Sequence, residues 1–577
     1  MKNKNYDFTF GDFGETTGMD IYLKGPDILR YNYINKGTAF TEDDRDKLKL
    51  NGYLPPRIKT LDEQVKASLE IIENKNNDIE RFIYIRSLYD RNVVLAHAVI
   101  ATNITRFLSI IYTPTVGLAC QQYSSMFRRA NGIHLHPRNI DKAEDILRNY
   151  SDREIRVAVV TDNQGILGIG DQGAGGIAIC LGKLMLYTQG AGIAPWHCLP
   201  ISLDVGTDNL QLLKDPSYLG YKHERLKNGD YLMFIEKFSK AFKKVFPNAL
   251  CQWEDFSKQN AFTIRDAYLH DLISFNDDIQ GTGSIALAGI LAAMKTKKES
   301  IKDQVFLVHG AGAGGIGIAE QIHTELVENG LSKEQANQRI FALDSRGIVT
   351  TDRKLELYKL KFAKDIKSLV WLKKPEDNTL LNTIINEKVT VLLGTSGQPG
   401  YFTKEIVTAV LQNTNKPVIL PLSNPTVKAE ALPKDIYKWT NGKALVATGS
   451  PFDPVEHKGK KYRIGQMNNA FIFPGVGLGI LASGAKEVLP AFFSASAHAV
   501  AEYITEEERK DGILCPPLEN LRDISKKVAM YVGAEAIKGG VCEDDCAFSD
   551  FKHRNDIERL NVIIEGMCWS PKYFPVT

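Results

Sequence analysis

The segment 310–315, GAGAGG, constrains the fold of this chain more than any other, because it has the spacing G-x-G-x-x-G. It follows the apolar run 305–308 and precedes a predicted helix over 316–327. Between a strand and a helix, Gly310 permits a tight turn, and Gly312 lets the backbone approach a pyrophosphate at the helix N-terminus. With Gly315 completing the motif, the segment predicts a Rossmann-type domain that binds a dinucleotide.

An acidic residue ends the next predicted strand of this domain. The run 339–343 ends at Asp344, where an acid typically binds the ribose diol of NAD and repels a 2′-phosphate. It lies further from the glycines than the usual ~20 residues, so a long intervening helix is needed. Ser345 and Arg346 follow directly, and Arg346 could offset the repulsion by a charge-assisted contact. We therefore predict NAD or NADP as the cofactor.

Short apolar runs alternate with helical stretches over much of the chain, which is typical of parallel α/β sheets. Residues 61–127 instead show apolar residues at helical spacing. We predict an α/β protein with a helical N-terminal domain and two sheets that meet near residue 275. The first sheet is expected from runs at 155–161, 198–203, 249–253 and 272–275, and the second from runs at 304–309, 339–343, 389–393, 417–422 and 444–447.

A second glycine-rich segment, 168–173, also fits G-x-G-x-x-G. Asp171 lies inside this loop, where its carboxylate would repel a phosphate. No acid follows at a useful distance before Asp204. The favoured interpretation is a set of tight turns around a catalytic carboxylate.

Acidic residues gather at the predicted strand ends of the first sheet, where ligands bind in open parallel sheets. Converging carboxylates repel one another unless a cation or a proton lies between them, and oxygen ligands without His or Cys favour Mg²⁺ or Mn²⁺. A helix-cap or turn role is favoured for Asp162 and Asp204. Two further pairs of adjacent acids follow predicted strands, Glu254 with Asp255 and Asp277 with Asp278, and for these a metal site is favoured.

Two further side chains have uncertain roles on pattern alone. Lys183 interrupts an otherwise apolar helical run, so it either extends along the surface to reach water or is a buried base with a depressed pKa. Tyr112 precedes a Thr-Pro turn and by itself would be a core tyrosine.

Composition excludes several functional classes. Lys plus Arg number 71 and Asp plus Glu 69, so no basic excess attracts nucleic acid or anionic lipid. The longest apolar stretches, such as 284–294, are about half as long as a membrane span, and no signal peptide is expected. Eight cysteines are too few for a disulfide scaffold. We expect a cytoplasmic protein that binds neither nucleic acid nor membrane.

Several segments together resemble the malic enzyme family. They run in order over most of the chain and comprise YTPTVGLACQQYSSMFRR, GILGIGDQGAGG, GKLMLYT, LDVGTDN, QWEDF, FNDDIQGTG, PLSNPT, ATGSPF and NNAFIFPG. The resemblance implies oxidative decarboxylation of L-malate to pyruvate and CO₂ with NAD or NADP and Mg²⁺ or Mn²⁺. It also implies a homodimer or homotetramer. The segment DSRG at 344–347 resembles the DSKG of NADP-linked members.

The resemblance also assigns roles to residues. It implies Glu254, Asp255 and Asp278 as metal ligands, Lys183 as the general base with Asp277 beside it, Tyr112 as the general acid, and Asn424 and Asn468 as substrate-binding residues. The implied domains are a helical domain over 1–128, a substrate and metal domain over 129–276 plus 467–540, a Rossmann domain over 277–466, and a tail over 541–577.

One difference from the malic enzyme pattern, at Gly165, leaves a second function open. Many malic enzymes have a carboxylate-binding arginine where this chain has Gly165, and malolactic enzymes resemble this sequence there. A malolactic enzyme would convert L-malate to L-lactate and CO₂ and recycle its cofactor within the site. A dinucleotide- or malate-binding subunit without activity is the hypothesis from another class, and the intact Tyr112, Lys183 and acidic residues argue against it.

Overall fold

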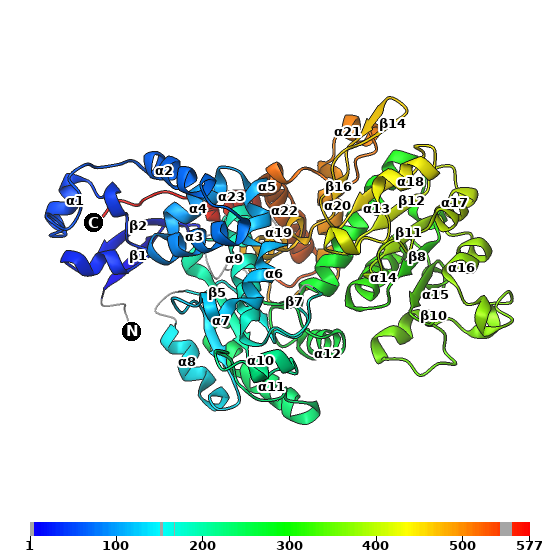
Figure 1. Ribbon diagram of the computed structural model, residues 1–577, viewed down its shortest axis with the longest axis horizontal. Coiled ribbons are helices and arrows are strands. Elements are labelled where there is room, and N and C mark those ends of the chain that lie inside the picture. The colour runs from blue at the N-terminus through cyan, green and yellow to red at the C-terminus, as the bar shows by residue number, and fades with distance from the viewer. Residues whose placement is uncertain (1–4, 151–153, 167, 543–556, 577) are drawn as a thin grey trace.

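The computed structural model describes residues 5–150, 154–166, 168–542 and 557–576. The helical N-terminal part lies at one end of an elongated molecule, and the predicted Rossmann-type sheet lies at the other (Figure 1). None of the helices in these described ranges is both long and apolar enough to cross a membrane.

Side-chain caps begin several helices of the N-terminal part. Thr60 forms a capping box at the first of them, and Asn77, Asn92 and Asn103 accept hydrogen bonds from the first turns of the next three. Such caps satisfy N–H groups that lack a partner within the helix. The predicted helical region is therefore confirmed. It comprises α2 (Leu61–Glu73), α3 (Asp78–Arg91), α4 (Val93–Ala101), α5 (Ile104–Ile111), α6 (Thr115–Gln121) and α7 (Tyr123–Met126).

The two ends of the described chain share a small core of their own. An antiparallel hairpin, β1 (Tyr6–Phe10) and β2 (Thr16–Ile21), precedes the short α1 (Glu42–Lys47). Trp196 stacks on Phe8 with ring centres 4.4 Å apart and also contacts Trp569 and Phe574, which follow α23 (Ile557–Met567). The start and the end of the chain are thus packed on the same aromatic side chain.

The first sheet has five parallel strands in the order β3-β5-β4-β6-β7. Its central strands are buried along their whole length, which explains why they read as continuous apolar runs. The strands are β3 (Ile133–Leu135), β4 (Val157–Thr161), β5 (Cys198–Leu203), β6 (Leu250–Trp253) and β7 (Ser274–Asn276), and the accompanying helices are α8 (Ala143–Tyr150), α9 (Ile177–Ala191), α10 (Leu210–Lys214), α11 (Asn228–Val245) and α12 (Lys258–Tyr268).

The second sheet has the order β10-β9-β8-β11-β12-β13-β16, parallel except for β10. The chain leaves β8 toward β9 on one side and later returns to β11 on the other, so the topological switch point lies between β8 and β11. The strands are β8 (Phe306–His309), β9 (Ile340–Asp344), β10 (Gly347–Ile348), β11 (Val391–Gly394), β12 (Val418–Pro421), β13 (Leu445–Thr448) and β16 (Gly465–Gln466). The helices are α14 (Ala313–Glu328), α15 (Lys333–Gln338), α16 (Leu380–Glu387), α17 (Lys404–Asn413) and α18 (Pro433–Trp439), and a small hairpin is formed by β14 (Val455–His457) and β15 (Lys460–Tyr462).

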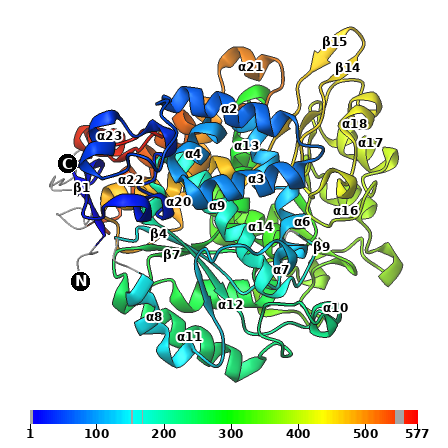
Figure 2. The ribbon, with the colours of Figure 1, turned by 60° about the vertical axis from the view of Figure 1, so that its left-hand side comes forward.

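The chain passes between the two sheets twice. The first crossing is a π-helical turn, Asp277–Gly281, which leads into α13 (Thr282–Lys297). The second crossing, after β16, leads into α19 (Phe473–Ser483). Late helices then pack back among the earlier elements, α22 against α9 and α20 against α13 (Figure 2). These helices are α20 (Ala491–Tyr503), α21 (Glu506–Lys510) and α22 (Leu521–Lys538).

Candidate functional site

A cleft of about 1820 Å³ lies at the carboxyl ends of the strands of both sheets. It is the kind of crevice where open parallel sheets bind ligands. Asp277 alone among the predicted site residues does not line this cleft, because it is fully buried behind Lys183. The lining residues are Tyr112, Lys183, Glu254, Asp255, Asp278, Gly310, Gly312, Gly315, Asp344, Ser345, Arg346, Asn424 and Asn468.

Three carboxylates converge where two neighbouring strands end. Glu254 and Asp255 follow β6, and Asp278 follows β7. Asp255 has a φ of +55°, which takes it out of the strand geometry that would direct adjacent side chains to opposite faces. Its backbone N–H donates to Asp278 Oδ2 at 2.7 Å. One oxygen from each of the three residues lies within 4.8 Å of the others, which suits a single divalent cation.

Holding three ionised carboxylates together in a buried site costs free energy unless a cation lies between them. Burial is the main cause that raises the pKa of Glu254 well above its usual range, and the neighbouring carboxylates add to it despite Lys183. Burial likewise raises the pKa of Asp278 to about 6, with Asp277 contributing. Acids that repel one another in a buried cluster fit the donor set of Mg²⁺ or Mn²⁺.

Lys183 lies on α9 with 1% of its surface exposed, so it does not extend to water. Its Nζ donates to Asp277 and lies 3.0 Å from Glu254 Oε1. Burial opposes the positive charge, but the two carboxylates outweigh it and hold the Lys183 pKa well above its usual range. This direction differs from the depressed pKa expected of a buried lysine without anionic partners. Lys183 and Asp277 instead form a charged pair that can share and pass a proton.

Two residues that the sequence did not single out hold this group in place. Gln252, two positions before Glu254 on β6, donates from Nε2 to Glu254 Oε2 at 2.8 Å and accepts from the Tyr187 hydroxyl at 2.5 Å. On the other side, Asn469 Nδ2 donates to Asp277 Oδ2 at 3.0 Å. Supporting hydrogen bonds of this kind fix the orientation of ligating carboxylates.

Tyr112 ends α5 and is 7% exposed. Its ring lies 5.2 Å from Lys183 Nζ. Burial raises the Tyr112 pKa well above its usual value despite the opposing effect of Lys183, and the nearby acids raise it further. The phenol therefore stays protonated near neutral pH and can act as a proton donor.

The two predicted asparagines present donors rather than acceptors to the cleft. Asn424 Oδ1 accepts a hydrogen bond from Ser450 Oγ at 2.6 Å, and Asn468 Oδ1 accepts one from the Ala470 backbone N–H at 2.9 Å. With each amide oxygen already accepting one hydrogen bond within the protein, the Nδ2 groups are the donors that these side chains can offer to a ligand. Amide N–H donors of this kind suit a carboxylate.

The dinucleotide loop requires its glycines. Gly310 has a φ of +122°, and a Cβ there would lie 2.6 Å from the carbonyl carbon of Thr395. A Cβ at Gly315 would collide with the carbonyl oxygen of Gly310. Gly312 is the N-cap residue of α14 and lines the cleft, so the N-terminus of this helix borders the space where a phosphate could bind. Lys258 lies beside Gly312, although it belongs to α12, a helix that accompanies the first sheet. The sequence analysis did not single out this residue.

Asp344 is already paired with cations. Its Oδ2 lies 2.6 Å from Arg353 Nη2 and 3.4 Å from Lys359 Nζ, and its Oδ1 accepts from the Arg346 backbone N–H. Burial opposes ionisation, but these partners hold the Asp344 pKa below its usual range. The negative charge of Asp344 is therefore largely balanced.

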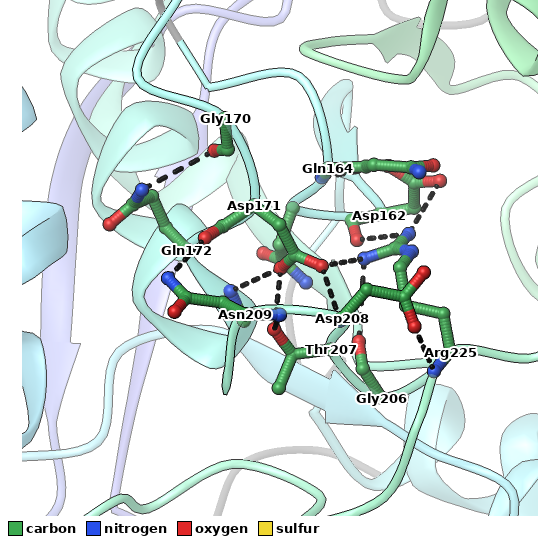
Figure 3. A network of polar contacts seen from close by, with 12 residues as sticks. Asp162, Gln164, Gly170, Asp171, Gln172, Gly206, Thr207, Asp208, Asn209 and Arg225 are labelled. Atoms are coloured by element: carbon green, nitrogen blue, oxygen red, sulfur yellow. Dashed lines mark hydrogen bonds and ion pairs between the residues drawn. The ribbon is translucent and has the colours of Figure 1, made fainter. Parts of the chain in front are cut away.

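The second glycine-rich loop is anchored by ion pairs (Figure 3). Arg225 lies 2.9 Å from Asp162 Oδ2 and 3.4 Å from Asp171 Oδ2. Asp171 also accepts hydrogen bonds from Thr207 Oγ1 and the Asp208 backbone N–H, and it does not line the cleft. Asp171 thus anchors the loop and is not the catalytic carboxylate that the sequence suggested. Asp162 and Asp204 accept backbone N–H bonds at turns, as expected.

Gly165 lies against the end of β6, where Glu254 and Asp255 of the carboxylate cluster follow. Its N–H donates to the Asp255 carbonyl oxygen at 2.6 Å, and a Cβ at this position would lie 2.5 Å from the Phe256 carbonyl oxygen. The observed backbone therefore has no room for an arginine at Gly165.

Comparisons with known proteins agree with this geometry. Residues 89–269 match the family model "Malic enzyme, N-terminal domain", and residues 279–537 match "Malic enzyme, NAD binding domain". The NAD-dependent malic enzyme of Shewanella baltica strain OS155 is 43% identical over 96% of this chain and 97% of its own length. That of Acinetobacter baylyi is 41% identical over 96% of each chain.

Solved structures show the same fold. The Entamoeba histolytica malic enzyme aligns with a TM-score of 0.54 and 22% identity over 80% of each chain. The Pyrococcus horikoshii malic enzyme aligns with a TM-score of 0.52 and 23% identity over 80% of this chain and 89% of its own. With two matching domain models and relatives above 40% identity over nearly the whole length, this chain belongs to the malic enzyme family.

Proposed function

We propose that this chain catalyses the oxidative decarboxylation of L-malate to pyruvate and CO₂, with NAD as hydride acceptor and Mg²⁺ or Mn²⁺ bound by Glu254, Asp255 and Asp278. The observation that carries the proposal is the joint cleft. Lys183 and the three carboxylates line the same cleft as the glycine loop 310–315. Asp277 lies behind Lys183 and accepts a hydrogen bond from it. Relatives named NAD-dependent malic enzyme support NAD as the cofactor.

In the proposed mechanism the residues of the cleft have separate roles. Asn424 and Asn468 orient malate through their amide N–H groups. Lys183 takes the C2 hydroxyl proton and passes its own proton to Asp277, so the pair as a whole acts as the base. NAD held at the Gly310–Gly315 loop would supply the acceptor for the hydride from C2. A bound divalent cation would polarise the C2 oxygen and stabilise the negative charge that develops as CO₂ departs. Tyr112 then protonates C3.

Gly165 supports a second candidate, a malolactic enzyme. Without an arginine at this position one charge-assisted contact to a substrate carboxylate is absent, a contact of about 1.5–3 kcal/mol. Its loss would weaken malate binding, but the bonds that break are set by the base, the acid and the cofactor. We therefore favour net oxidation of malate.

Product analysis tests the choice. Purified protein with malate, Mn²⁺ and NAD is expected to release pyruvate and reduced NAD in a one-to-one ratio to the malate consumed. The measurement follows absorbance of the reduced nicotinamide together with lactate and pyruvate. Stoichiometric lactate without accumulating reduced NAD would establish the malolactic reaction instead, and no turnover with either cofactor would favour a binding subunit.

We also propose that NADP is accepted. Arg353 and Lys359 balance the charge of Asp344, and Arg346 lines the cleft beside it. Arg346→Ala is expected to raise the KM for NADP about tenfold, the value of one charge-assisted contact, and to leave the KM for NAD nearly unchanged. Lys354→Ala, which removes an exposed cation in the segment after β10 that does not line the cleft, is the matched control. An equal rise for both cofactors would contradict the role of Arg346.

The remaining parts of the proposal concern organisation. The domain limits 1–128, 129–276 plus 467–540, and 277–466 follow the family resemblance, as does assembly into a homodimer or homotetramer. Within the proposed tail, 541–577, residues 543–556 lie outside the described residues. A cytoplasmic location is proposed because eight cysteines are too few for a disulfide scaffold.

A further inference from the structure

Two aromatic side chains meet at the switch point of the second sheet. His309 is the last residue of β8, immediately before Gly310, and Tyr401 lies in the loop that follows the neighbouring strand β11. Their rings are stacked, with centres 4.4 Å apart and planes inclined by 12°. Both residues line the cleft. The pair therefore bridges the crevice between the two strands whose loops border the proposed dinucleotide site.

The two rings differ in exposure. His309 is 6% exposed, whereas Tyr401 is 43% exposed. Phe402, fully buried beside them, has its ring centre 5.9 Å from that of His309. The imidazole is thus enclosed between the sheet and Tyr401, and it holds the tyrosine ring in a fixed plane. Tyr401 keeps a large uncovered surface on a wall of the cleft.

Packing alone does not account for a histidine at this position. The Nδ1 atom of His309 is buried and has no hydrogen-bond partner among the described residues. Burial lowers the His309 pKa to about 4, so the ring is neutral near pH 7 and adds no charge to the site. A leucine would fill such a position without leaving a buried nitrogen unsatisfied. Histidine differs from leucine in having a planar ring, which can stack on the ring of Tyr401.

The position of the pair relative to the glycine loop suggests its ligand. A pyrophosphate over Gly312 and a ribose at Asp344 would place the adenosine half of a dinucleotide at the end of the cleft near β9. The base joined to that ribose must then lie against the side chains that follow β8, β9 and β11. Two aromatic residues with accessible surface line the cleft here: Tyr401, which is 43% exposed, and Tyr358, which is only partly exposed and already stacks on Phe262. Tyr401 therefore offers the larger free face.

We propose that Tyr401, held in place by His309, binds the adenine ring of the dinucleotide by stacking. The inference rests on the proposed function, because it requires a dinucleotide in this cleft. Every base has a π-face, and removing an aromatic partner of a base typically weakens binding about 5- to 150-fold. Tyr401 would then be the residue that makes the adenine half contribute to cofactor affinity.

Calorimetric titration with AMP, NAD and nicotinamide mononucleotide tests the proposal on the purified full-length protein. Tyr401→Ala is expected to weaken binding of AMP and NAD about tenfold and to leave nicotinamide mononucleotide, which lacks adenine, unchanged. Tyr401→Phe keeps the ring and should bind all three like the wild type. His309→Leu should weaken AMP and NAD binding about threefold, because the tyrosine loses its stacked support.

A matched control is Tyr53→Ala, which removes a 58% exposed tyrosine that does not line the cleft and should leave all three affinities unchanged. Unchanged binding of AMP and NAD by Tyr401→Ala would overturn the inference. So would an equal loss for all three ligands, because that result indicates a general distortion of the cleft. If the wild type binds no NAD, the proposed function fails as well. If it binds NAD and Tyr401→Ala binds it equally, only the stacking role fails.

Discussion

Replacing Lys183 by alanine is expected to lower kcat about 10²–10⁴-fold while the KM for malate changes much less. The reason is the position of Lys183 between the cleft and Asp277, where it is the group that can take the substrate proton and relay its own. Steady-state kinetics over a range of malate concentrations, at saturating NAD and Mn²⁺, separates the two parameters.

The substitution also leaves Asp277 and Glu254 buried without their cation, so a loss of folding has to be distinguished from a loss of chemistry. Lys297 offers a matched control, because its side chain is equally buried and lies 2.8 Å from Glu299, outside the cleft. Lys297→Ala should keep a kcat near the wild-type value. A Lys183→Ala protein with near-wild-type kcat would remove this residue from the mechanism.

Asp278→Asn is expected to weaken the binding of Mn²⁺ by at least about tenfold, because one ionised oxygen ligand of the cluster becomes a neutral amide. Titration of the metal-free protein with Mn²⁺, followed by electron paramagnetic resonance of the free ion, measures the affinity without turnover. Asp278 Oδ2 also accepts the Asp255 backbone N–H, and an asparagine has a single oxygen to accept this bond or to bind the ion.

Asp204→Asn is the control for this titration. Asp204 is also buried and follows a strand of the same sheet, but it accepts backbone N–H bonds at a turn and does not line the cleft. Its replacement should leave the Mn²⁺ affinity of the folded protein unchanged. Wild-type affinity in Asp278→Asn would show that Asp278 is not a ligand.

The fold was predictable to a large extent because its sheets are parallel and buried. Strands of this kind appear in a sequence as continuous apolar runs, and β4, β5, β6 and β8 lie within the runs from which they were expected. The glycine loop and the acids at strand ends were visible for the same reason, since each directly follows such a run. The three-residue β3 was not predicted, because it is too short to stand out from its surroundings.

Other parts of the molecule depend on contacts between distant segments. Nothing local marks Gln252 as a partner of Glu254, because its role arises from the Tyr187 hydroxyl on another element. Lys258 has the sequence setting of an ordinary surface lysine at a helix start, and only the approach of the two sheets brings it to Gly312. Only the family resemblance paired Lys183 with Asp277, because the two residues are 94 positions apart and nothing local to Lys183 points to its partner.

The two chain crossings between the sheets have a consequence for how such an enzyme can move. The first crossing carries Asp277 and Asp278, and the second carries Asn468 and Asn469. Asn469 ties the crossings together by donating to the Asp277 side chain and backbone. In many enzymes the hinge residues lie far from the chemistry. Here the same few residues would have to serve as both hinge and catalytic apparatus, so any rotation of one sheet against the other would change the distance between the base and its substrate. Opening the cleft to exchange ligands would thereby also switch the chemistry off.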